Sequence, residues 1–366
     1  MMYRVAIVGA YGNFGSIIYS KLKGEANAPF ILAVGRDEQK LSALCQGDKG
    51  SYWAGDAHSA AFVEVLRKHQ INLVIHTAGP FQGQDYAVAR SAITAGANYC
   101  DLSDCRHFVR GISILDDLAQ QAGVFVLSGC SSVPTLSSGV IDYFEPLFRK
   151  IHTIDFGITS SSKMPGVSTV RGVLEYAGKH IEQFENGMVK RVFGWQNLTL
   201  HRFPGLGGRL LANVDVPDMD IFPARYGALT VRFQAGAGLK LGTLANFCAA
   251  SLARLGVVRC ASVCADWLHQ IGKRFEWLGD KKSLMFITIA GIGIDGLPYS
   301  HRWEIEAWDD KGPTIPASGA VALTTMQMAG VAIEAGARAC VGVIPMETYL
   351  EAIGEPLITT RDHSGI

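Results

Sequence analysis

The sequence predicts an α/β protein with a doubly wound parallel sheet in its amino-terminal part and a second α+β domain with a mixed or antiparallel sheet. Three observations support this prediction. A chain of 366 residues is long enough for two domains. In its first third, short apolar runs alternate with segments of helical periodicity. Beyond Ser128, strand-like segments are separated by long stretches that contain Gly and Pro.

The first third contains six strand-like runs in alternation with five helical segments. Val5–Val8 and Leu73–Ile75 are apolar throughout, as expected of parallel strands that are covered on both faces. The runs are YRVAIVG, FILAVG, SYWAGD, NLVIHTAG, NYCDLS and VFVLSG, and the helical segments are Phe14–Lys23, Asp37–Leu44, Ser59–His69, Tyr86–Ala95 and Phe108–Gln121. We expect residues 1–135 to form one domain around these elements.

The rest of the chain predicts a second domain and a returning helix. From Ile151 to about Pro316, the segments TIDFGITS, MFITIAGIGI and HRWEIEAW have strand character. Ala317–Gly336 is rich in Ala, Val, Leu and Met, which predicts a deeply buried helix. We expect residues 317–352 to complete the first domain and residues 136–316 to form the second.

The charge balance argues against polyanionic partners. Lys plus Arg and Asp plus Glu both number 33, so no overall field attracts nucleic acid. We expect no transmembrane segment, because Leu284–Ile294 is too short and because Arg254 and Arg259 interrupt Leu241–Val263. The second stretch leaves three interpretations open: a buried helix, a dimer face, or a helix in peripheral contact with a membrane.

A glycine-containing run, AIVGAYGNFGSIIYSKL, joins the first strand to the first helix. In such a unit the first glycine permits a tight turn, the second lets a pyrophosphate approach the backbone, and the third lets helix and strand pack closely. The helix that begins near Phe14 directs its free N–H groups at the phosphates. The predicted dinucleotide site comprises Gly9, Ala10, Tyr11, Gly12, Asn13, Phe14 and Gly15.

The residues after the next strands indicate which dinucleotide binds. Arg36 offers a planar fork for the 2′-phosphate of NADP, and the adjacent Asp37 keeps NAD as an alternative through the ribose 2′-OH. Asp56 is expected either to meet the adenine amino group or to cap the following helix. The turn that ends the fourth strand is expected to run alongside the cofactor through Ala78, Gly79, Pro80 and Phe81.

The stretch HTAGPFQGQDYAVARSAITAGANYCDLSD resembles the saccharopine dehydrogenase-like, NADP-binding oxidoreductases, which pair a GxxGxxG loop with an AGPF turn and an AG-x-x-Y-x-D-L-S strand. SGCSSVPTLSSG is similar to the family's Ser-Val-Pro turn, and KGPTIPASGAVAL and GARACVGVIPMETYL look like its carboxyl-terminal segments. The resemblance implies a Rossmann domain, a second domain that contacts substrate and forms a homodimer, and a carboxyl-terminal helix that returns to the first domain.

Two stretches depart from the family pattern. Ser103-Asp104-Cys105 stands where the family often has a glycine and then a glutamate. SSSKMPGVST replaces a turn similar to Ser-Gly-Gly-Thr. The second departure falls in the segment that the resemblance would assign to substrate contact.

Hydride transfer requires a proton donor or acceptor near the reacting carbon. In NYCDLSD, period two places Tyr99, Asp101 and Ser103 on one side of the strand end. We interpret Asp101 as a candidate acid/base or substrate-orienting group, Tyr99 as a candidate phenolic donor and Ser103 as a candidate substrate contact. The alternatives are structural: Asp101 would cap a helix, and Tyr99 would pack as an amphipathic wall.

Further substrate contacts are expected beyond the sixth strand. Ser132 is predicted to shape the floor beneath the nicotinamide. A helix that opens near Ser168, with Lys163 and Arg171 nearby, predicts a pocket for a carboxylate or other anion. The alternative there is an ordinary cap with surface cations.

The eight scattered cysteines, with no signal-peptide pattern at the amino terminus, predict a cytoplasmic protein with free thiols. Cys100, Cys105 and His107 lack a fourth ligand and a standard spacing, so no metal site is predicted. Cys130 could act as a nucleophile beside a base, but a small buried thiol is the ordinary case.

These observations predict an NADP-dependent oxidoreductase that moves a hydride to or from a small-molecule substrate. Two other functions stay open. One is a sensor or scaffold that binds NADP(H) without turnover. The other is a reductase of lipid or carrier-bound substrates at a membrane surface, suggested by the mean hydropathy of +0.18 and by Leu241–Val263.

Overall fold

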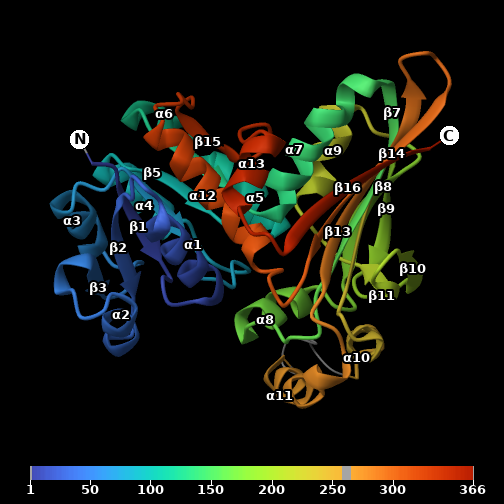
Figure 1. The fold of residues 1–366 in the computed structure, drawn as a ribbon, viewed down its shortest axis with the longest axis horizontal. Coiled ribbons are helices and arrows are strands. Elements are labelled where there is room, and N and C mark those ends of the chain that lie inside the picture. Colours follow the sequence, from blue (N-terminus) through green and yellow to red (C-terminus); the bar gives the residue numbers. More distant parts are fainter. Residues whose placement is uncertain (1, 258–264, 366) are drawn as a thin grey trace. The chain divides into compact units, whose positions relative to one another are not determined.

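The computed structural model describes residues 2–257 and 265–365, except for the side chains of Lys49, residues 167–169 and Leu268. Within these ranges the chain divides into two compact units, each with its own β-sheet (Figure 1). The first unit comprises Met1–Gly139 and Pro313–Gly354, and the second comprises Val140–Gly312 and Glu355–Ile366.

The described part of the first unit contains a seven-stranded parallel sheet in the order β15-β6-β5-β4-β1-β2-β3. The chain order reverses between β1 and β4, which is where open α/β sheets bind ligands. The six predicted strands are confirmed as the first six strands of the chain. The strands are β1 (Arg4–Val8), β2 (Phe30–Gly35), β3 (Tyr52–Ala54), β4 (Leu73–His76), β5 (Asn98–Asp101), β6 (Phe125–Ser128) and β15 (Gly336–Ala339).

Helices cover both faces of this sheet, as the apolar strands require. On one face α12 packs against α1 and α13, and on the other α4 packs against α3 and α6. The helices are α1 (Asn13–Gly24), α2 (Glu38–Leu44), α3 (Ala61–Lys68), α4 (Ala87–Ala95), α5 (Arg106–Gly111), α6 (Asp116–Ala122), α12 (Thr314–Met328) and α13 (Met346–Ile353).

The helix predicted over Phe108–Gln121 is broken in the structure. A 3₁₀ turn, Ile112–Leu115, separates α5 from α6, although its two apolar ends keep the buried face continuous. The Tyr86 hydroxyl donates a hydrogen bond to the carbonyl of Phe108 at 2.9 Å, and it lies where a Cβ on Gly111 would be. The hydroxyl of Tyr86 thus lies at the position where the α-helix gives way to the tighter 3₁₀ turn.

The helix predicted over Ala317–Gly336 ends earlier, at Met328. Gly330 has φ +78°, and Val331 N–H donates to the carbonyl of Met326 at 3.0 Å. This left-handed glycine closes α12 in a Schellman turn. The residues beyond it lead into β15, an edge strand that the sequence interpretation did not include.

The second unit is built on a mixed sheet, which confirms the predicted second fold. Its described residues form nine strands, with β12 parallel to β7 and other pairs such as β7–β13 and β13–β14 antiparallel. The strands are β7 (Phe148–Thr159), β8 (His180–Glu185), β9 (Met188–Phe193), β10 (Thr199–Phe203), β11 (Gly207–Asn213), β12 (Thr230–Gly236), β13 (Ser283–Gly293), β14 (Pro298–Ala307) and β16 (Ile358–Gly365).

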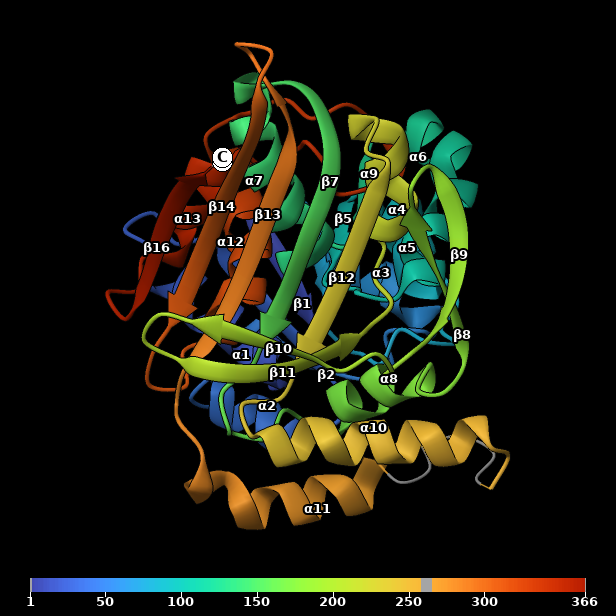
Figure 2. The ribbon, with the colours of Figure 1, turned by 90° about the vertical axis from the view of Figure 1, so that its right-hand side faces the viewer.

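Helices α7 and α9 cover one face of this sheet (Figure 2). The ring of Phe156 in β7 lies 5.7 Å from that of Phe222 in α9, and Phe144 in α7 lies 4.0 Å from His301 in β14. The helices of this unit are α7 (Ser137–Phe144), α8 (Val167–Glu175), α9 (Asp218–Tyr226), α10 (Lys240–Arg254) and α11 (Ala265–Phe275), followed by the 3₁₀ turn η6 (Glu276–Leu278).

One of the two apolar stretches considered for membrane insertion is a strand, and the other begins as a helix. Leu284–Ile294 falls almost entirely in β13, and Leu241–Val263 begins in α10 and ends outside the described residues. No helix in the described ranges has the length and apolar character needed to cross a bilayer.

Candidate functional site

The glycine turn after β1 has the geometry that brings a phosphate close to the backbone. Gly9 has φ +83°, and a Cβ there would lie 2.9 Å from Thr77 Oγ1. A Cβ on Gly15 would collide with the Gly9 carbonyl oxygen, so only glycine lets α1 pack this closely on β1. A Cβ on Gly12 would meet only the Gly9 carbonyl within 4 Å, at 3.0 Å. The three glycines therefore fit the three roles that a dinucleotide-binding turn requires.

The amino terminus of α1 presents its N–H groups without a competing cap. Gly12 is the N-cap and has no side chain, and the first turn carries no acidic residue. Gly12 accepts the hydrogen bond of Ser16 N–H at 2.9 Å. The N–H groups that precede Ser16 in α1, together with the helix dipole, are thus available to an anion.

At the end of β2, the acid is held by the helix that follows and lies beside one of the two cations. Asp37 is the N-cap of α2, where its carboxylate accepts from Lys40 N–H at 3.1 Å and lies 3.2 Å from the Lys40 ammonium. These interactions, led by the backbone hydrogen bond, lower the pKa of Asp37. The Lys40 ammonium lies 5.5 Å from the ring centroid of Tyr11 in the glycine turn. Arg36 and Lys40 therefore place two cations near this end of the sheet.

Asp56 follows β3 on the exposed surface. Its carboxylate accepts from His58 N–H at 3.0 Å and lies 3.2 Å from His58 Nδ1. The backbone hydrogen bond is the main cause of its lowered pKa, and the charge of Arg36 also contributes. Asp56 lies five residues before the start of α3 at Ala61, so it organises the preceding turn rather than the helix itself.

The turn after β4 is fixed against the glycine turn. Thr77 Oγ1 donates to the carbonyls of Val8 at 2.9 Å and Gly9 at 3.2 Å. Gln84 Nε2 donates to the carbonyls of Ala78 at 2.8 Å and Pro80 at 2.7 Å, and so holds the shape of the turn. Gln84 was not among the predicted site residues, because no motif or periodicity distinguishes it in the sequence.

The predicted catalytic side chains lie in the interior. Tyr99 and Asp101 have no exposed surface, because β5 lies between β4 and β6 and helices cover both faces of the sheet. The Tyr99 hydroxyl lies 3.0 Å from Nδ1 of His76, which ends β4. Burial raises the pKa of Tyr99 well above its usual value and lowers that of His76 to about 3. Sequence reasoning expected this polar side of β5 to face a ligand, whereas the structure buries it.

Asp101 joins the end of β5 to the turn after β6. Its Oδ1 accepts from Ser103 N–H at 2.9 Å, Gly129 N–H at 2.9 Å and Ser128 Oγ at 3.0 Å. Burial, which is only partly offset by these hydrogen bonds, raises its pKa to about 6. Ser103 is itself fully buried and accepts from Cys105 N–H at 3.1 Å. Ser132, in the helical turn that follows β6, is also buried.

Residues 5–127 match the family model described as the saccharopine dehydrogenase NADP binding domain. Residues 5–127 therefore belong to this domain family. The match covers the glycine turn, Arg36, Asp56, the turn after β4 and Asp101, and it confirms the resemblance drawn from the motifs. The unit is thus a nicotinamide-dinucleotide-binding domain. A search among curated proteins found no match to the chain.

Solved structures share the fold of the whole chain. Apo saccharopine dehydrogenase (L-Glu forming) from Saccharomyces cerevisiae aligns over 100% of both chains, with a TM-score of 0.69 and 13% identity. Homospermidine synthase from Legionella pneumophila in complex with NAD aligns over 100% of this chain and 91% of its own, with a TM-score of 0.60 and 9% identity. Amine dehydrogenase from Mycobacterium smegmatis aligns over 94% and 96%, with a TM-score of 0.52 and 12% identity. At these identities the likeness establishes the fold.

Cys100, Cys105 and His107 do not form a metal site among the described residues. Cys100 is buried in β5 whereas His107 is exposed, and the described residues contain no group of three His, Cys, Asp or Glu that could hold a metal ion. Hydrogen bonding to Cys100, together with burial, raises the pKa of Cys130 well above its usual value. Cys130 is therefore a protonated thiol, which is not the nucleophilic form.

The predicted anion pocket of the second unit is only partly free. Arg171 pairs with Asp266 of α11 at 2.6 Å, so this cation is already engaged. Lys163 is exposed in the loop before α8. Ser168 belongs to α8, and its side chain lies outside the described residues.

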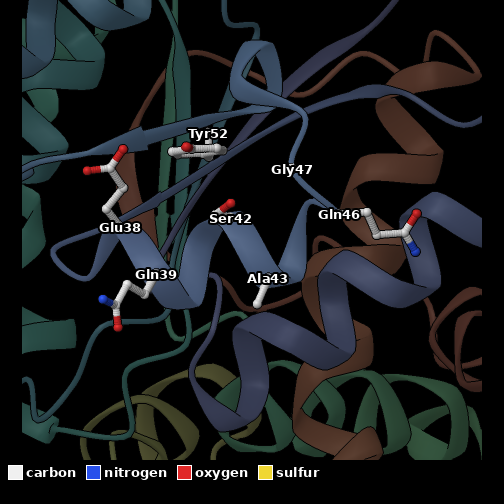
Figure 3. Close-up of a pocket in the computed structure, with 7 residues that line it drawn as sticks. All are labelled: Glu38, Gln39, Ser42, Ala43, Gln46, Gly47 and Tyr52. Atoms are coloured by element: carbon white, nitrogen blue, oxygen red, sulfur yellow. The ribbon is translucent and has the colours of Figure 1, made fainter.

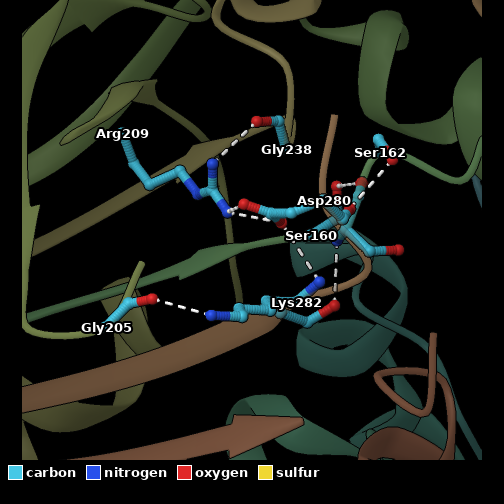
Figure 4. A network of polar contacts seen from close by, with 9 residues as sticks. Ser160, Ser162, Gly205, Arg209, Gly238, Asp280 and Lys282 are labelled. Carbon is cyan, nitrogen blue, oxygen red and sulfur yellow. Dashed lines mark hydrogen bonds and ion pairs between the residues drawn. The ribbon is translucent and has the colours of Figure 1, made fainter. Parts of the chain in front are cut away.

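A buried polar network holds the loop that precedes α8 (Figure 4). The guanidinium of Arg209, whose side chain is 7% exposed, forks onto both oxygens of Asp280 at 2.6 and 2.7 Å and donates to the carbonyl of Gly238 at 3.0 Å. The Asp280 carbonyl accepts from both N–H and Oγ of Ser162, at 2.9 and 2.8 Å. Arg209 and Asp280 thus position the loop that carries Lys163, and neither was predicted, because they are 71 residues apart in sequence.

A surface depression also occurs in the first unit, around α2 (Figure 3). None of its lining residues belongs to the glycine turn or to the turn after β4, and none is a cation that could hold a phosphate. It is lined by Glu38, Gln39, Ser42, Ala43, Gln46, Gly47 and Tyr52. The depression is therefore separate from the residues that form the candidate dinucleotide site.

Proposed function

We propose that the protein is an NADP-dependent oxidoreductase that transfers a hydride between the nicotinamide and a small carbonyl, imine, alcohol or amine substrate. The observation that carries this proposal is the glycine turn. Gly9 and Gly15 bring α1 close to β1, and the missing side chain of Gly12 leaves the uncapped helix terminus open to a pyrophosphate. When bound, the nicotinamide would supply or accept the hydride.

The preference for NADP rests on the charges after β2. Arg36 and Lys40 are two cations suited to a 2′-phosphate. Asp37, which could instead accept a hydrogen bond from the ribose 2′-OH of NAD, is engaged by Lys40 and caps α2. NAD stays the alternative, since the homospermidine synthase with the same fold was solved with NAD.

Other residues would complete the cofactor site. We assign the phosphates to the segment from Gly9 to Gly15, including Ala10, Tyr11, Asn13 and Phe14. Asp56 would approach the adenine, because its carboxylate lies exposed after β3. The turn of Ala78, Gly79, Pro80 and Phe81 would border the cofactor, because Thr77 fixes it beside Gly9.

Asp101 and Tyr99 would act by positioning. Neither has exposed surface, so we assign them to holding the protein groups at the ends of β5 and β6 rather than to direct contact with substrate. Asp101 would fix the backbone of Ser103 and Gly129, and Ser132 would support the floor of the site. Tyr99 would hold His76 beneath the turn after β4.

In the second unit we assign substrate contact to Lys163, whose loop is held by the Arg209–Asp280 pair. Ser168 stays a predicted contact for the same anion, and Arg171 would contribute to it only if its pair with Asp266 opens. We further propose a homodimer and a cytoplasmic location. The family resemblance supports the first, and the free cysteines among the described residues support the second.

A non-catalytic NADP(H)-binding protein is the second candidate. It is favoured by the burial of Tyr99 and Asp101, because neither of these two proton-transfer candidates of β5 has exposed surface. Catalytic turnover of NADPH is the property that separates the two functions.

The proposal is tested with Gly12→Asp, which places a carboxylate in the path of the pyrophosphate. Gly24→Asp is the control, because a Cβ at the other end of α1 meets nothing within 4 Å. NADPH fluorescence should show binding to the wild-type protein and to Gly24→Asp, and a loss of about tenfold or more for Gly12→Asp. NADPH oxidation with a panel of carbonyl and imine compounds should then show turnover. Binding without turnover would favour the non-catalytic function, and equal binding by all three proteins would contradict the assigned site.

A further inference from the structure

The exposed side of α10 is apolar along its whole length. Surface helices of globular proteins normally expose charged or polar side chains instead. The exposed positions recur at spacings of three and four residues, so they form one stripe. The stripe consists of Leu241 (66% exposed), Leu244 (38%), Cys248, Leu252 (45%) and Leu255 (76%). The opposite side of α10 is buried through Thr243 and Ala250 and contacts β11.

Large exposed aromatic side chains occur in the neighbouring helix and turn. Trp267 and Phe275 in α11 are 65% and 47% exposed, and Trp277 in η6 is 77% exposed. Figures 1 and 2 both place α10 and α11 at the same end of the second unit. We call the α10 stripe together with these three aromatic residues the apolar end of the second unit.

The cations near this apolar end have no acidic partner in the part of the chain that the structure describes. Lys240 and Arg254 mark the two ends of α10, and Lys273 and Arg274 lie in the last turn of α11. None of the four forms an ion pair with a described residue, although Arg254 stacks on Phe193 at 4.0 Å. The local charge is positive, although the whole chain is neutral.

The two acids of this region are already engaged. Asp266 pairs with Arg171 at 2.6 Å, and Glu276 accepts from the backbone N–H of Met164 at 2.9 Å. The Asp266 charge is offset by Arg171, and Glu276 keeps one negative charge against the four cations of α10 and α11, so the local charge stays positive. Leucine side chains, indole rings and unpaired cations together are the composition of a helix surface that lies in a bilayer interface.

We propose that the apolar end of the second unit docks on a phospholipid bilayer that contains anionic lipids. The leucines of α10 would enter the boundary between headgroups and acyl chains, the indoles would lie at the headgroups, and the four cations would meet anionic phosphates. A second copy of the chain is a poorer occupant, because a symmetric contact would bring the same cations face to face. This proposal does not depend on the proposed oxidoreductase activity.

Flotation of the full-length protein with vesicles tests the proposal. One set of vesicles contains phosphatidylcholine alone, and the other contains phosphatidylcholine with phosphatidylglycerol. The test variant is Leu252→Asp with Leu255→Asp. The matched control is Ile294→Asp, since Ile294 is 73% exposed in the β13–β14 turn, at the opposite end of the sheet in Figure 2. A second test variant, Lys273→Glu with Arg274→Glu, changes charge without removing apolar surface.

We expect the wild-type protein and Ile294→Asp to float with the anionic vesicles. Both test variants should lose at least about tenfold in partitioning. The tryptophan emission of the wild-type protein should shift to shorter wavelength on binding.

Two outcomes would overturn the proposal: wild-type protein that stays in solution with both kinds of vesicle, or test variants that float as well as the control. A dimer in sedimentation equilibrium that Leu252→Asp with Leu255→Asp dissociates, without vesicle binding by the wild type, would assign the surface to a second copy. NADPH titration of the same samples reports separately on the cofactor site.

Discussion

The carboxylate of Asp37 accepts a hydrogen bond from the backbone N–H of Lys40 and lies 3.2 Å from the ammonium of the same residue. The acid after β2 is thus engaged by its own helix. We expect Asp37→Asn, which keeps the N-cap, to leave NADH affinity unchanged. NADPH affinity should rise about two- to fivefold, because a negative charge beside Arg36 is removed. Fluorescence titration measures both. A drop in NADH affinity would show instead that Asp37 holds the ribose.

Close packing at Gly15 gives a second prediction. A Cβ there would collide with the Gly9 carbonyl, whereas a Cβ on Gly24 of the same helix would meet nothing within 4 Å. Gly15→Ala should lower the free energy of unfolding by about 1–3 kcal/mol and abolish NADPH binding. Gly24→Ala should be neutral or stabilising by up to about 1 kcal/mol. Urea unfolding and NADPH titration measure the two effects, and equal behaviour of the variants would refute the close approach.

The raised pKa of Asp101 makes one contribution to stability fall as pH rises. Its pKa is about 6 in the folded protein, against 3.8 ordinarily, so the folded state binds the proton more tightly. Relative to Asp101→Asn, the wild-type protein should lose about 2–3 kcal/mol between about pH 4 and pH 6. Urea unfolding at several pH values measures this difference. A difference that does not change with pH would mean that the carboxyl titrates normally.

His76 should show the opposite pH dependence. Burial lowers its pKa from 6.5 to about 3, so its contribution is fully present above pH 6.5 and is lost as pH falls toward 3. Relative to His76→Gln, the wild-type protein should lose about 2–5 kcal/mol over this range. Because each slope is measured against its own variant, the contributions of His76 and Asp101 are separable. If the stability difference from the variant changed with pH in the same direction for His76 and for Asp101, the burial of one of the two residues would be contradicted.

The Arg209–Asp280 pair predicts a large effect in the second unit. Asp280→Ala leaves a guanidinium that is 7% exposed without its carboxylate, and should cost about 2–4 kcal/mol in unfolding free energy. Lys281→Ala, next in the chain, removes only the exposed pair with Asp309 and should cost less than about 1 kcal/mol. Thermal and urea unfolding compare the two variants. If the two variants lost similar amounts of unfolding free energy, the Arg209–Asp280 pair would contribute no more to stability than an exposed ion pair does.

The glycine turn could be predicted from sequence because its three glycines, the preceding apolar strand and the following helix are all local. The same holds for β1 to β6, whose continuous apolar runs are visible in the sequence. The end of α12 could also have been found, since Gly330 is a strong helix stop that the apolar composition of the segment outweighed. The break between α5 and α6 was less visible, because it involves Tyr86, the N-cap residue of α4, through a contact that the fold creates.

The burial of Tyr99 and Asp101 could not be predicted from the strand alone. Period two correctly places them on one side of β5, but whether that side is covered depends on helices that follow elsewhere in the chain. The structural roles of Gln84, Arg209 and Asp280 could not be predicted from the sequence for a related reason. Each acts through contacts that the fold creates, and Gln84, although it lies three residues after the AGPF turn, is not one of the positions that define that motif.

The most direct test is a titration of the purified protein with NADPH and NADH, repeated with Arg36→Ala. The wild-type protein should bind NADPH more tightly than NADH. Arg36→Ala should lose about tenfold or more in NADPH affinity while NADH affinity stays the same, because a charge-assisted hydrogen bond to the 2′-phosphate is removed. Failure of the wild-type protein to bind either dinucleotide would contradict the account and leave the glycines as turn-formers only.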